Sequence, residues 1–224
     1  MIHLGHSMLN TLQPDSLTTL LKQQLGMPLP GSQVQRLMAP ELAYGRHFGP
    51  SAQGARRAAV LVLLYPDQDQ WYLPTASRPM QMKEHGGQIA LPGGMVDAGE
   101  SPREAALREL DEELGVRLGN KAILGELSPI FVFNSNFHVH PYLAICDHRP
   151  EFKPSEDEVA ELIPVPLRVL LDPASRGQHQ IHCWGKTFRA PHYSVGRHQI
   201  WGATSLILAE VAAILAAACG REPL

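Results

Sequence analysis

The most constraining feature of the sequence is the 23-residue stretch GMVDAGESPREAALRELDEELGV, at positions 94–116. A strong helix start lies in its middle. Ser101 can act as the N-cap, Pro102 needs no N–H at the first helical position, and Glu104 completes a capping box. Gly115 is suited to end the helix in a left-handed conformation. These signals predict a helix of about 13 residues between the N-cap and this glycine.

The predicted helix has one apolar face and one acidic face. The apolar positions share one arc: Ala106, Leu107, Leu110 and Leu114. A neighbouring arc of roughly 100° carries the carboxylates of Glu109, Glu112 and Glu113. Such a cluster destabilises a helix, because Glu109 and Glu113 repel each other at i,i+4 and two of the glutamates oppose the negative end of the helix dipole. The apolar arc, in contrast, is expected to pack on a core.

Two interpretations of the acidic arc are open. The first is a solvated acidic face, the ordinary position of Glu and Arg clusters on an amphipathic helix. The second is a metal site, since clustered carboxylates without Cys or His suit Mg²⁺ or Mn²⁺ better than zinc. Arg108 stands four residues before Glu112 and can pair with it, which would hold that carboxylate in one rotamer.

The spacing of the whole segment favours the second interpretation. It consists of Gly94, five residues, Glu100, seven residues, Arg108-Glu109-Leu110, one residue, Glu112-Glu113, one residue and Gly115-Val116. This spacing matches every defined position of the Nudix signature, so the chain resembles the Nudix hydrolase family. The resemblance implies an α/β fold, the Nudix α/β/α sandwich with a mixed β-sheet. It also implies metal-dependent hydrolysis of a nucleoside diphosphate linked to another group.

The resemblance implies roles for the carboxylates. Glu109 and Glu113 are expected to bind Mg²⁺ or Mn²⁺, with Glu112 as a further ligand or as the base that activates water. Glu158 is a rival base, because Nudix proteins differ in where this group lies. Arg108 is counted among the catalytic residues because it can hold Glu112.

Backbone groups and one loop acid complete the expected site. Gly93 and Gly94 lack a Cβ, so the backbone can approach a metal ion or a phosphate oxygen closely. Glu100 is either an outer metal ligand or a solvated acid of the loop before the helix.

Upstream, positions 77–94 resemble one branch of the family more narrowly. The segment SRPMQMKEHGGQIALPGG is similar to a motif of the coenzyme A pyrophosphatase branch through Arg78, Lys83, Gly87-Gln88 and Leu91-Pro92-Gly93-Gly94. Lys83 stands where that motif has a second Arg, and Leu91 stands where it has Phe. The resemblance implies that Arg78, Lys83, Gln88 and Gly93 bind the substrate. The alternative for the two cations is an ordinary surface position. Similar segments follow at 155–159 and 200–204.

The resemblance to this branch implies a specific reaction, the hydrolysis of coenzyme A or an acyl derivative to 3′,5′-ADP and 4′-phosphopantetheine or its acyl form. The first alternative is the same chemistry on ADP-ribose or dinucleotides. The second alternative is a catalytically silent module that binds a nucleotide as a sensor. The intact glutamates argue against a silent module, because binding alone does not need all three of them.

Length and composition set the remaining expectations. A chain of 224 residues with 44% hydrophobic content can bury the core of one domain with elaborations. Periodicity and Pro/Gly-rich turn signals predict an N-terminal helix and irregular connector over 1–54 and a catalytic domain over 55–224. The net charge of −3 provides no basic footprint for nucleic acid as the main partner. The apolar stretch 206–219 is shorter than a membrane crossing and contains Glu210, so no membrane association is expected.

Three cysteines without a pairing pattern indicate reduced thiols in a cytoplasmic protein. The residues leave the oligomeric state open, with a homodimer as one candidate.

Periodicity and turn signals predict elements outside the signature. A helix opened by Asp15 or Ser16 is expected over 15–25, and the region of His182, His192 and His198 is interpreted as loop-like. The other expected elements are a buried strand over 58–65, a hairpin loop over 66–70, a returning strand over 71–76, strands within 122–133 and 138–146, and a C-terminal helix.

Overall fold

The computed structural model describes residues 9, 12–41, 51, 53–81, 87–183 and 185–221. The helices are α2 (Pro14–Leu25), α3 (Ser32–Gln35), α4 (Pro102–Leu114), α5 (Leu167–Leu171) and α6 (Ala203–Ala218), with 3₁₀ turns η1 (Arg36–Met38), η4 (Asn120–Ala122) and η5 (Pro173–Ser175). The strands are β1 (Arg56–Asp67), β2 (Gln70–Ser77), β3 (Ile89–Ala90), β4 (Gly93–Met95), β5 (Ile123–Glu126), β6 (Ile130–Val132), β7 (Phe137–Ile145), β8 (Glu161–Pro166), β9 (Arg176–Cys183), β10 (Lys186–Val195) and β11 (His198–Trp201).

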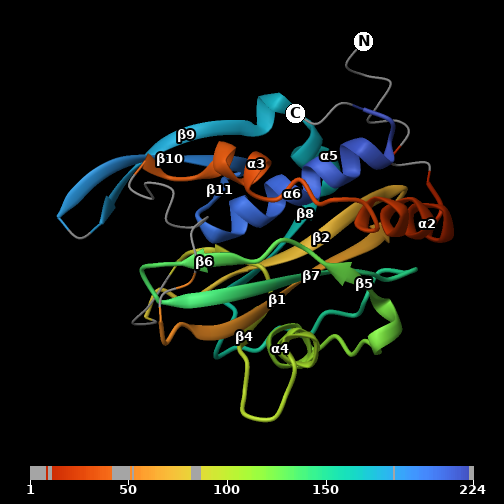
Figure 1. Cartoon of the computed structure of the whole chain (residues 1–224), viewed down its shortest axis with the longest axis horizontal. Helices are drawn as coiled ribbons and strands as arrows, with labels where there is room; N and C mark the ends of the chain where they lie inside the picture. Colours follow the sequence, from red (N-terminus) through yellow and green to blue (C-terminus); the bar gives the residue numbers. More distant parts are fainter. Residues whose placement is uncertain are drawn as a thin grey trace.

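The main sheet is mixed and has helices on both faces. Its strands follow the order β3-β2-β1-β7-β5, and β4, β6 and β8 pair with β1, β7 and β2 respectively. Strand β1 runs parallel to β7 and antiparallel to β2 and β4. Helix α4 lies on one face, and α6 lies on the other with α2, α3 and α5 (Figure 1). The expected α/β/α sandwich with a mixed sheet is confirmed.

Strand β1 is buried on both faces, which explains its continuous apolar run. Leu61 and Leu63 belong to the core shared with α4, whereas Val62 and Leu64 belong to the core shared with α2 and α6. Successive side chains of a strand point to opposite faces, so a strand between two helical layers needs apolar residues at every position. The hairpin after it is tighter than expected, since Asp67 already pairs with Gln70.

Helix α4 begins and ends where the sequence predicts. The Ser101 hydroxyl accepts the N–H of Glu104 at 3.3 Å, and the Glu104 carboxylate accepts the N–H of Ser101 at 2.8 Å. At the other end Gly115 has φ 67° and donates its N–H to the Asp111 carbonyl at 2.8 Å. A Cβ on Gly115 would lie 2.7 Å from the Cβ of Lys153, so glycine is required by packing as well as by conformation.

Helix α2 begins one residue earlier than expected. Pro14 is its first residue, and Gln13 at the N-cap makes no side-chain capping bond, so the prediction that Asp15 or Ser16 opens the helix is wrong. Proline starts the helix because its fixed φ suits the first turn and its missing N–H has no partner there. Leu17 and Leu21 are fully buried in the α6-side core.

A buried glutamate fastens the N-terminal segment to α6. Glu210 is completely buried, and its side-chain oxygens accept four hydrogen bonds, so these buried polar atoms are satisfied. The donors are the Gly31 N–H (3.1 Å), Gln35 Nε2 (3.1 Å), and both the N–H (3.0 Å) and the hydroxyl (2.6 Å) of Ser128. The segment around α3 therefore packs on the same core as the main sheet. The domain boundary at residue 54 stays a prediction.

The interpretation of the region around His182, His192 and His198 as loop-like is wrong. This region forms a second, antiparallel sheet with the order β11-β10-β9. In β10 the alternate positions Phe188, Ala190 and His192 are buried. That period of two was the available signal, and Pro191 and His192 among the alternating residues obscured it.

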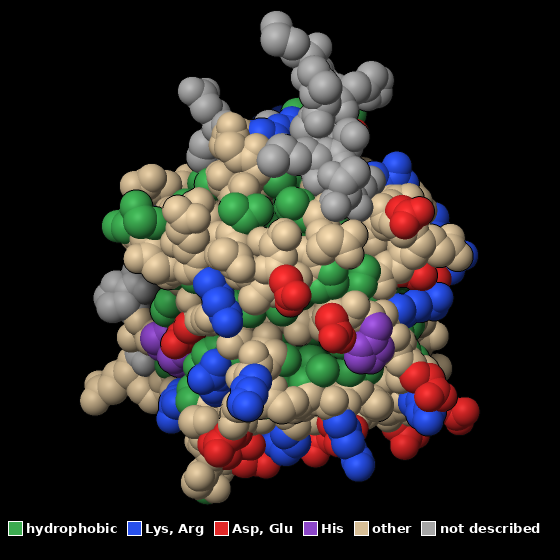
Figure 2. All heavy atoms as spheres, turned by 90° about the vertical axis from the view of Figure 1, so that its right-hand side faces the viewer, with side chains coloured by type: hydrophobic (Ala, Val, Ile, Leu, Met, Phe, Trp, Pro, Cys, Tyr) green, Lys and Arg blue, Asp and Glu red, His purple; other side chains and the backbone are tan. Residues whose placement is uncertain are grey.

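The surface carries both signs of charge. On the face in Figure 2, acidic and basic side chains are interspersed over the lower part of the molecule. Among the residues that the structure describes, no helix is both long and apolar enough to cross a membrane.

Candidate active site

The glycine turn before α4 lies directly against two of the helix carboxylates. Strand β4 pairs Gly93 and Gly94 with β1. The Gly93 N–H donates to Oε2 of Glu113 at 3.2 Å. A Cβ on Gly94 would overlap the Glu109 carboxylate, at 2.5 Å from its Cδ. The sheet register thus brings Glu109 and Glu113 together at a backbone that only glycine allows.

Glu113 is a buried acid with a strongly displaced pKa. Its exposed fraction is 7%, and Nη2 of Arg78 lies 3.6 Å from its Oε1. Burial raises the pKa of Glu113 to about 7; Arg78 and the Gly93 N–H oppose the rise, and the charges of Glu109 and Glu158 add to it. A buried acid whose pKa is shifted this far is typical of a functional site.

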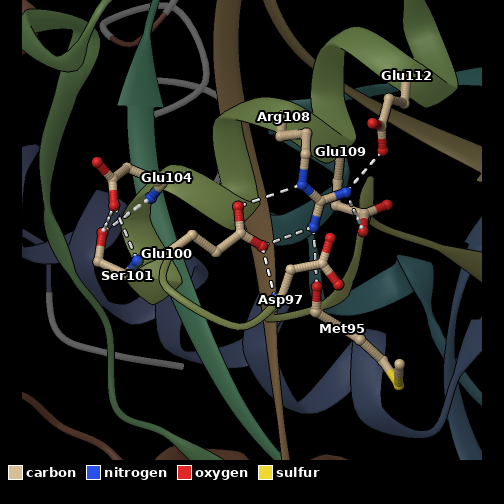
Figure 3. A network of polar contacts seen from close by, with 8 residues as sticks. All are labelled: Met95, Asp97, Glu100, Ser101, Glu104, Arg108, Glu109 and Glu112. Atoms are coloured by element: carbon tan, nitrogen blue, oxygen red, sulfur yellow. Dashed lines mark hydrogen bonds and ion pairs between the residues drawn. The ribbon is translucent and has the colours of Figure 1, made fainter.

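Arg108 holds the surrounding acidic groups in place, as Figure 3 shows. Its Nη1 donates to Glu109 at 2.9 Å and to Glu112 at 2.6 Å, so the pairing with Glu112 expected from the sequence is present. Its Nε and Nη2 donate to Glu100 at 3.2 and 2.8 Å, and Nη2 also donates to the Met95 carbonyl at 2.9 Å. The pair with Glu112 is exposed and by itself contributes little stability, whereas the contacts with Glu100 and Glu109 are partly buried. Their effect is to fix the geometry of three carboxylates.

Glu100 accepts hydrogen bonds within the Arg108 network. It accepts the Asp97 N–H at 2.8 Å in addition to the two Arg108 donors, and the contact with Arg108 lowers its pKa. The role of Glu100 as an outer metal ligand stays a prediction. The Met95 carbonyl and the Asp97 N–H were missed by sequence reasoning, because backbone groups carry no residue-type signal. The available signal was the Asp-Ala-Gly-Glu sequence before the helix, whose residue types favour a tight turn.

The two candidate bases differ in their surroundings. The side chain of Glu112 is 53% exposed and bonded to Arg108. Glu158 lies in a turn whose Ser155 N–H donates to the Glu113 carbonyl at 2.9 Å. Burial raises the pKa of Glu109, the contact with Arg108 opposes the rise, and the charges of Glu112 and Glu158 add to it. The Glu158 charge also adds to the rise of the Glu113 pKa. The fold thus brings Glu158 close to the carboxylates of α4, although it is distant from them in sequence.

Two of the predicted substrate-binding residues, Arg78 and Gln88, lie at the base of one loop. The Arg78 N–H donates to the Gln88 carbonyl at 3.1 Å, and the Gly87 N–H donates to the Arg78 carbonyl at 3.0 Å. Lys83 lies outside the described residues. The position of Arg78 beside Glu113 joins this loop to the acidic cluster.

The donor set fits a hard divalent cation. Carboxylate oxygens are the ligands that Mg²⁺ and Mn²⁺ prefer, and Glu109 and Glu113 present theirs at one backbone turn. Both acids have raised pKa values, since burial and neighbouring negative charges disfavour their ionised forms. A cation held there would offset this destabilisation.

Comparison with known proteins identifies the family. The NUDIX domain family matches residues 55–184, more than half of the chain. The chain belongs to the Nudix family. As a Nudix hydrolase it acts on phosphoanhydride bonds, and hydrolases of this family generally use divalent cations such as Mg²⁺ or Mn²⁺.

Two relatives share the name "Uncharacterized Nudix hydrolase NudL". The one from Pectobacterium atrosepticum is 40% identical over 113 residues, which cover 50% of this chain and 58% of that protein. The one from Yersinia pestis (strain Pestoides F) is 32% identical over 158 residues, which cover 70% of this chain and 78% of that protein. A crystal structure of a MutT/nudix family protein from Enterococcus faecalis has a TM-score of 0.54 at 19% identity, covering 75% of this chain and 65% of that chain. This last likeness supports the Nudix fold alone.

The close approach at Gly94 leads to a prediction. Gly94→Ala is expected to displace the Glu109 carboxylate, because the new Cβ would overlap it. The end of a glutamate side chain can move, so the fold should persist while kcat/KM falls roughly a hundredfold, as for a catalytic group displaced by about 1 Å. The measurement is Mg²⁺-dependent hydrolysis together with a melting curve. Gly119→Ala is the matched control, since a Cβ there meets nothing within 4 Å. A folded Gly94→Ala variant with wild-type turnover would contradict the placement of Glu109 in the site.

Proposed function

We propose that the protein hydrolyses the diphosphate of coenzyme A or an acyl derivative, giving 3′,5′-ADP and 4′-phosphopantetheine or its acyl form. The observation that carries this proposal is the position of Arg78, whose guanidinium lies 3.6 Å from Glu113. Arg78 belongs to the segment that resembles the coenzyme A branch. An arginine beside the acidic cluster is suited to a substrate with several phosphates, because guanidinium–phosphate contacts are strong and directional.

In this proposal some of the acidic residues bind a metal ion and another accepts a proton. A divalent cation bound by Glu109 and Glu113, with Glu112 on the exposed side, would neutralise the diphosphate and activate the attacking water. Glu158 accepts the proton that this water loses as its oxygen attacks one phosphorus and the bond to the bridging oxygen breaks. Arg108 positions Glu109 and Glu112 through its hydrogen bonds.

Other residues are proposed to shape the substrate side. The Gly93 N–H orients Glu113, and Gly94 leaves room for the Glu109 carboxylate. Arg78 binds a phosphate, including the ribose 3′-phosphate that distinguishes coenzyme A from its dephospho form. Lys83 and Gln88 stay predicted substrate-binding residues.

A substrate panel tests the proposal. The enzyme is expected to prefer coenzyme A to dephospho-coenzyme A in kcat/KM by about ten- to a hundredfold, the value of a charge-assisted phosphate contact. Arg78→Ala lowers activity on both substrates, because Arg78 also contacts Glu113. It should lower activity on coenzyme A more, so the ratio between the two substrates isolates the phosphate contact. Arg117→Ala is the control, since that exposed arginine pairs with Asp111 instead.

The panel also contains ADP-ribose, NADH and diadenosine polyphosphates, with products separated by chromatography. If ADP-ribose is hydrolysed fastest, the coenzyme A assignment is wrong. If nothing is hydrolysed with Mg²⁺ or Mn²⁺ while a nucleotide raises the melting temperature, the protein is a binding module.

The proposed partner is thus a small nucleotide-containing molecule. Two further expectations stay predictions, namely a cytoplasmic location and a homodimer. The described cysteine side chains Cys146 and Cys219 are free and buried, which suits a reducing compartment.

A further inference from the structure

The segment 200–204 lies next to the base of the loop that joins Arg78 to Gln88. It lies on the face of the main sheet opposite to α4 (Figure 1). Thr204, in the first turn of α6, has an exposed fraction of 8%. Its hydroxyl donates to the Ile89 carbonyl in β3 at 3.1 Å. Strand β3 follows directly after Gln88 and leads into the glycine turn. Thr204 thus contacts the short strand that connects the Arg78–Gln88 pair to the Gly93-Gly94 turn.

The pairing of β3 with β2 explains why this carbonyl needs a partner. Ser77 lies opposite Ile89, and the next hydrogen bond runs from the Arg78 N–H to the Gln88 carbonyl. In an antiparallel pair, bonded and non-bonded residue pairs alternate, so Ser77 and Ile89 form a non-bonded pair. The Ile89 carbonyl therefore points away from β2, towards the edge where Thr204 meets it.

We propose that Thr204 is a positioning residue for substrate binding. Its hydroxyl fixes Ile89, and Ile89 fixes the base of the loop where Arg78 bonds to Gly87 and Gln88. Arg78 is thereby kept beside Glu113, in reach of a substrate phosphate. The inference rests on the proposed function, because Arg78 is the proposed phosphate-binding residue.

Thr204 is a firm anchor because its surroundings are fixed. Ile200 pairs with Tyr193, and both side chains are fully buried. Leu206 of α6 is fully buried in the main core. The Ser205 hydroxyl bonds to the Gly202 carbonyl at 2.9 Å, within the same turn. Strand β3 has only two residues and few hydrogen bonds of its own. A hydrogen bond from a side chain on the rigid helix α6 can therefore fix the position of β3.

Three variants test this role. Thr204→Val removes the hydroxyl and keeps the shape, Thr204→Ser keeps the hydroxyl, and Ser205→Ala removes a neighbouring buried hydroxyl that does not reach β3. We expect Thr204→Val to raise KM about three- to tenfold, the worth of one hydrogen bond, with kcat within about twofold. Amide hydrogen exchange of Arg78 and Gly87 should accelerate in the same variant. Thr204→Ser should restore both values, and Ser205→Ala should leave both unchanged.

The outcomes that overturn the proposal are equally definite. Unchanged KM and unchanged exchange in Thr204→Val would show that the bond to Ile89 has no positioning effect. Equal increases of KM in Thr204→Val and Ser205→Ala would show general destabilisation of the start of α6. The exchange measurement needs no substrate, and the kinetics use whichever substrate of the panel is hydrolysed fastest. An error in the coenzyme A assignment is therefore distinguishable from an error in the role of Thr204.

Discussion

Glu113→Gln is expected to lower kcat/KM with Mg²⁺ by at least about a hundredfold, because it removes the charge of a proposed metal ligand and a bound divalent cation would contribute several kcal/mol to catalysis. The fold should persist, since glutamine has nearly the same volume and its amide oxygen can still accept the Gly93 N–H. Asp111→Asn on the same helix is the control, because that carboxylate pairs with Arg117 outside the site. Wild-type turnover by folded Glu113→Gln would show that Glu113 is not a ligand.

The same variant should change how the stability of the metal-free protein depends on pH. Burial raises the pKa of Glu113 from 4.5 to about 7, so the unfolded chain loses this proton first as pH rises. The contribution of Glu113 to stability is therefore fully present below pH 4.5 and is lost as pH rises through about 7. A shift of this size corresponds to about 3 kcal/mol.

Melting curves in a chelator measure this effect. Between about pH 5 and about pH 8, the wild type should lose melting temperature relative to Glu113→Gln. Added Mg²⁺ should restore stability to the wild type more than to the variant, because a cation favours the ionised carboxylate. Parallel pH profiles of the two proteins would contradict the displaced pKa.

Glu158→Gln is the second change with a large expected effect. As the proposed general base, Glu158 should account for roughly 10²–10⁴ in kcat, and its loss should remove the acidic limb of the pH profile. Glu112→Gln should lower kcat less, because Glu112 is half exposed and fastened to Arg108. Glu156→Gln is the matched control, since Glu156 lies in the same turn and is also exposed.

The comparison separates the two candidate bases. A larger loss of kcat with an altered pH profile in Glu112→Gln would assign the base to Glu112 instead. Less than about a tenfold loss in both variants would exclude general-base catalysis by either residue.

The sequence by itself determined the central helix of this protein. Ser101, Glu104 and Gly115 act within one or two turns of the chain, so their hydrogen bonds could be expected without knowledge of the fold. The pairing of Arg108 with Glu112 is equally local, since residues four apart on a helix are neighbours. The signature spacing likewise led to the family, which the comparison confirms.

The same local reasoning failed where the signal was weak. The second sheet was missed because its alternating burial at Phe188, Ala190 and His192 is mixed with polar residues. The formation of these strands depends on packing against neighbouring strands more than on their own apolar pattern.

Only the tertiary structure decided how the site is assembled. The contact of Arg78 with Glu113, the nearness of Glu158 and the bond from Thr204 to Ile89 join segments that are far apart in sequence. Their positions depend on sheet register and on the packing of helices against both faces, which no local spacing encodes. The displaced pKa of Glu113 has the same origin, because burial is a property of the packed molecule and not of the residue or its neighbours in the chain.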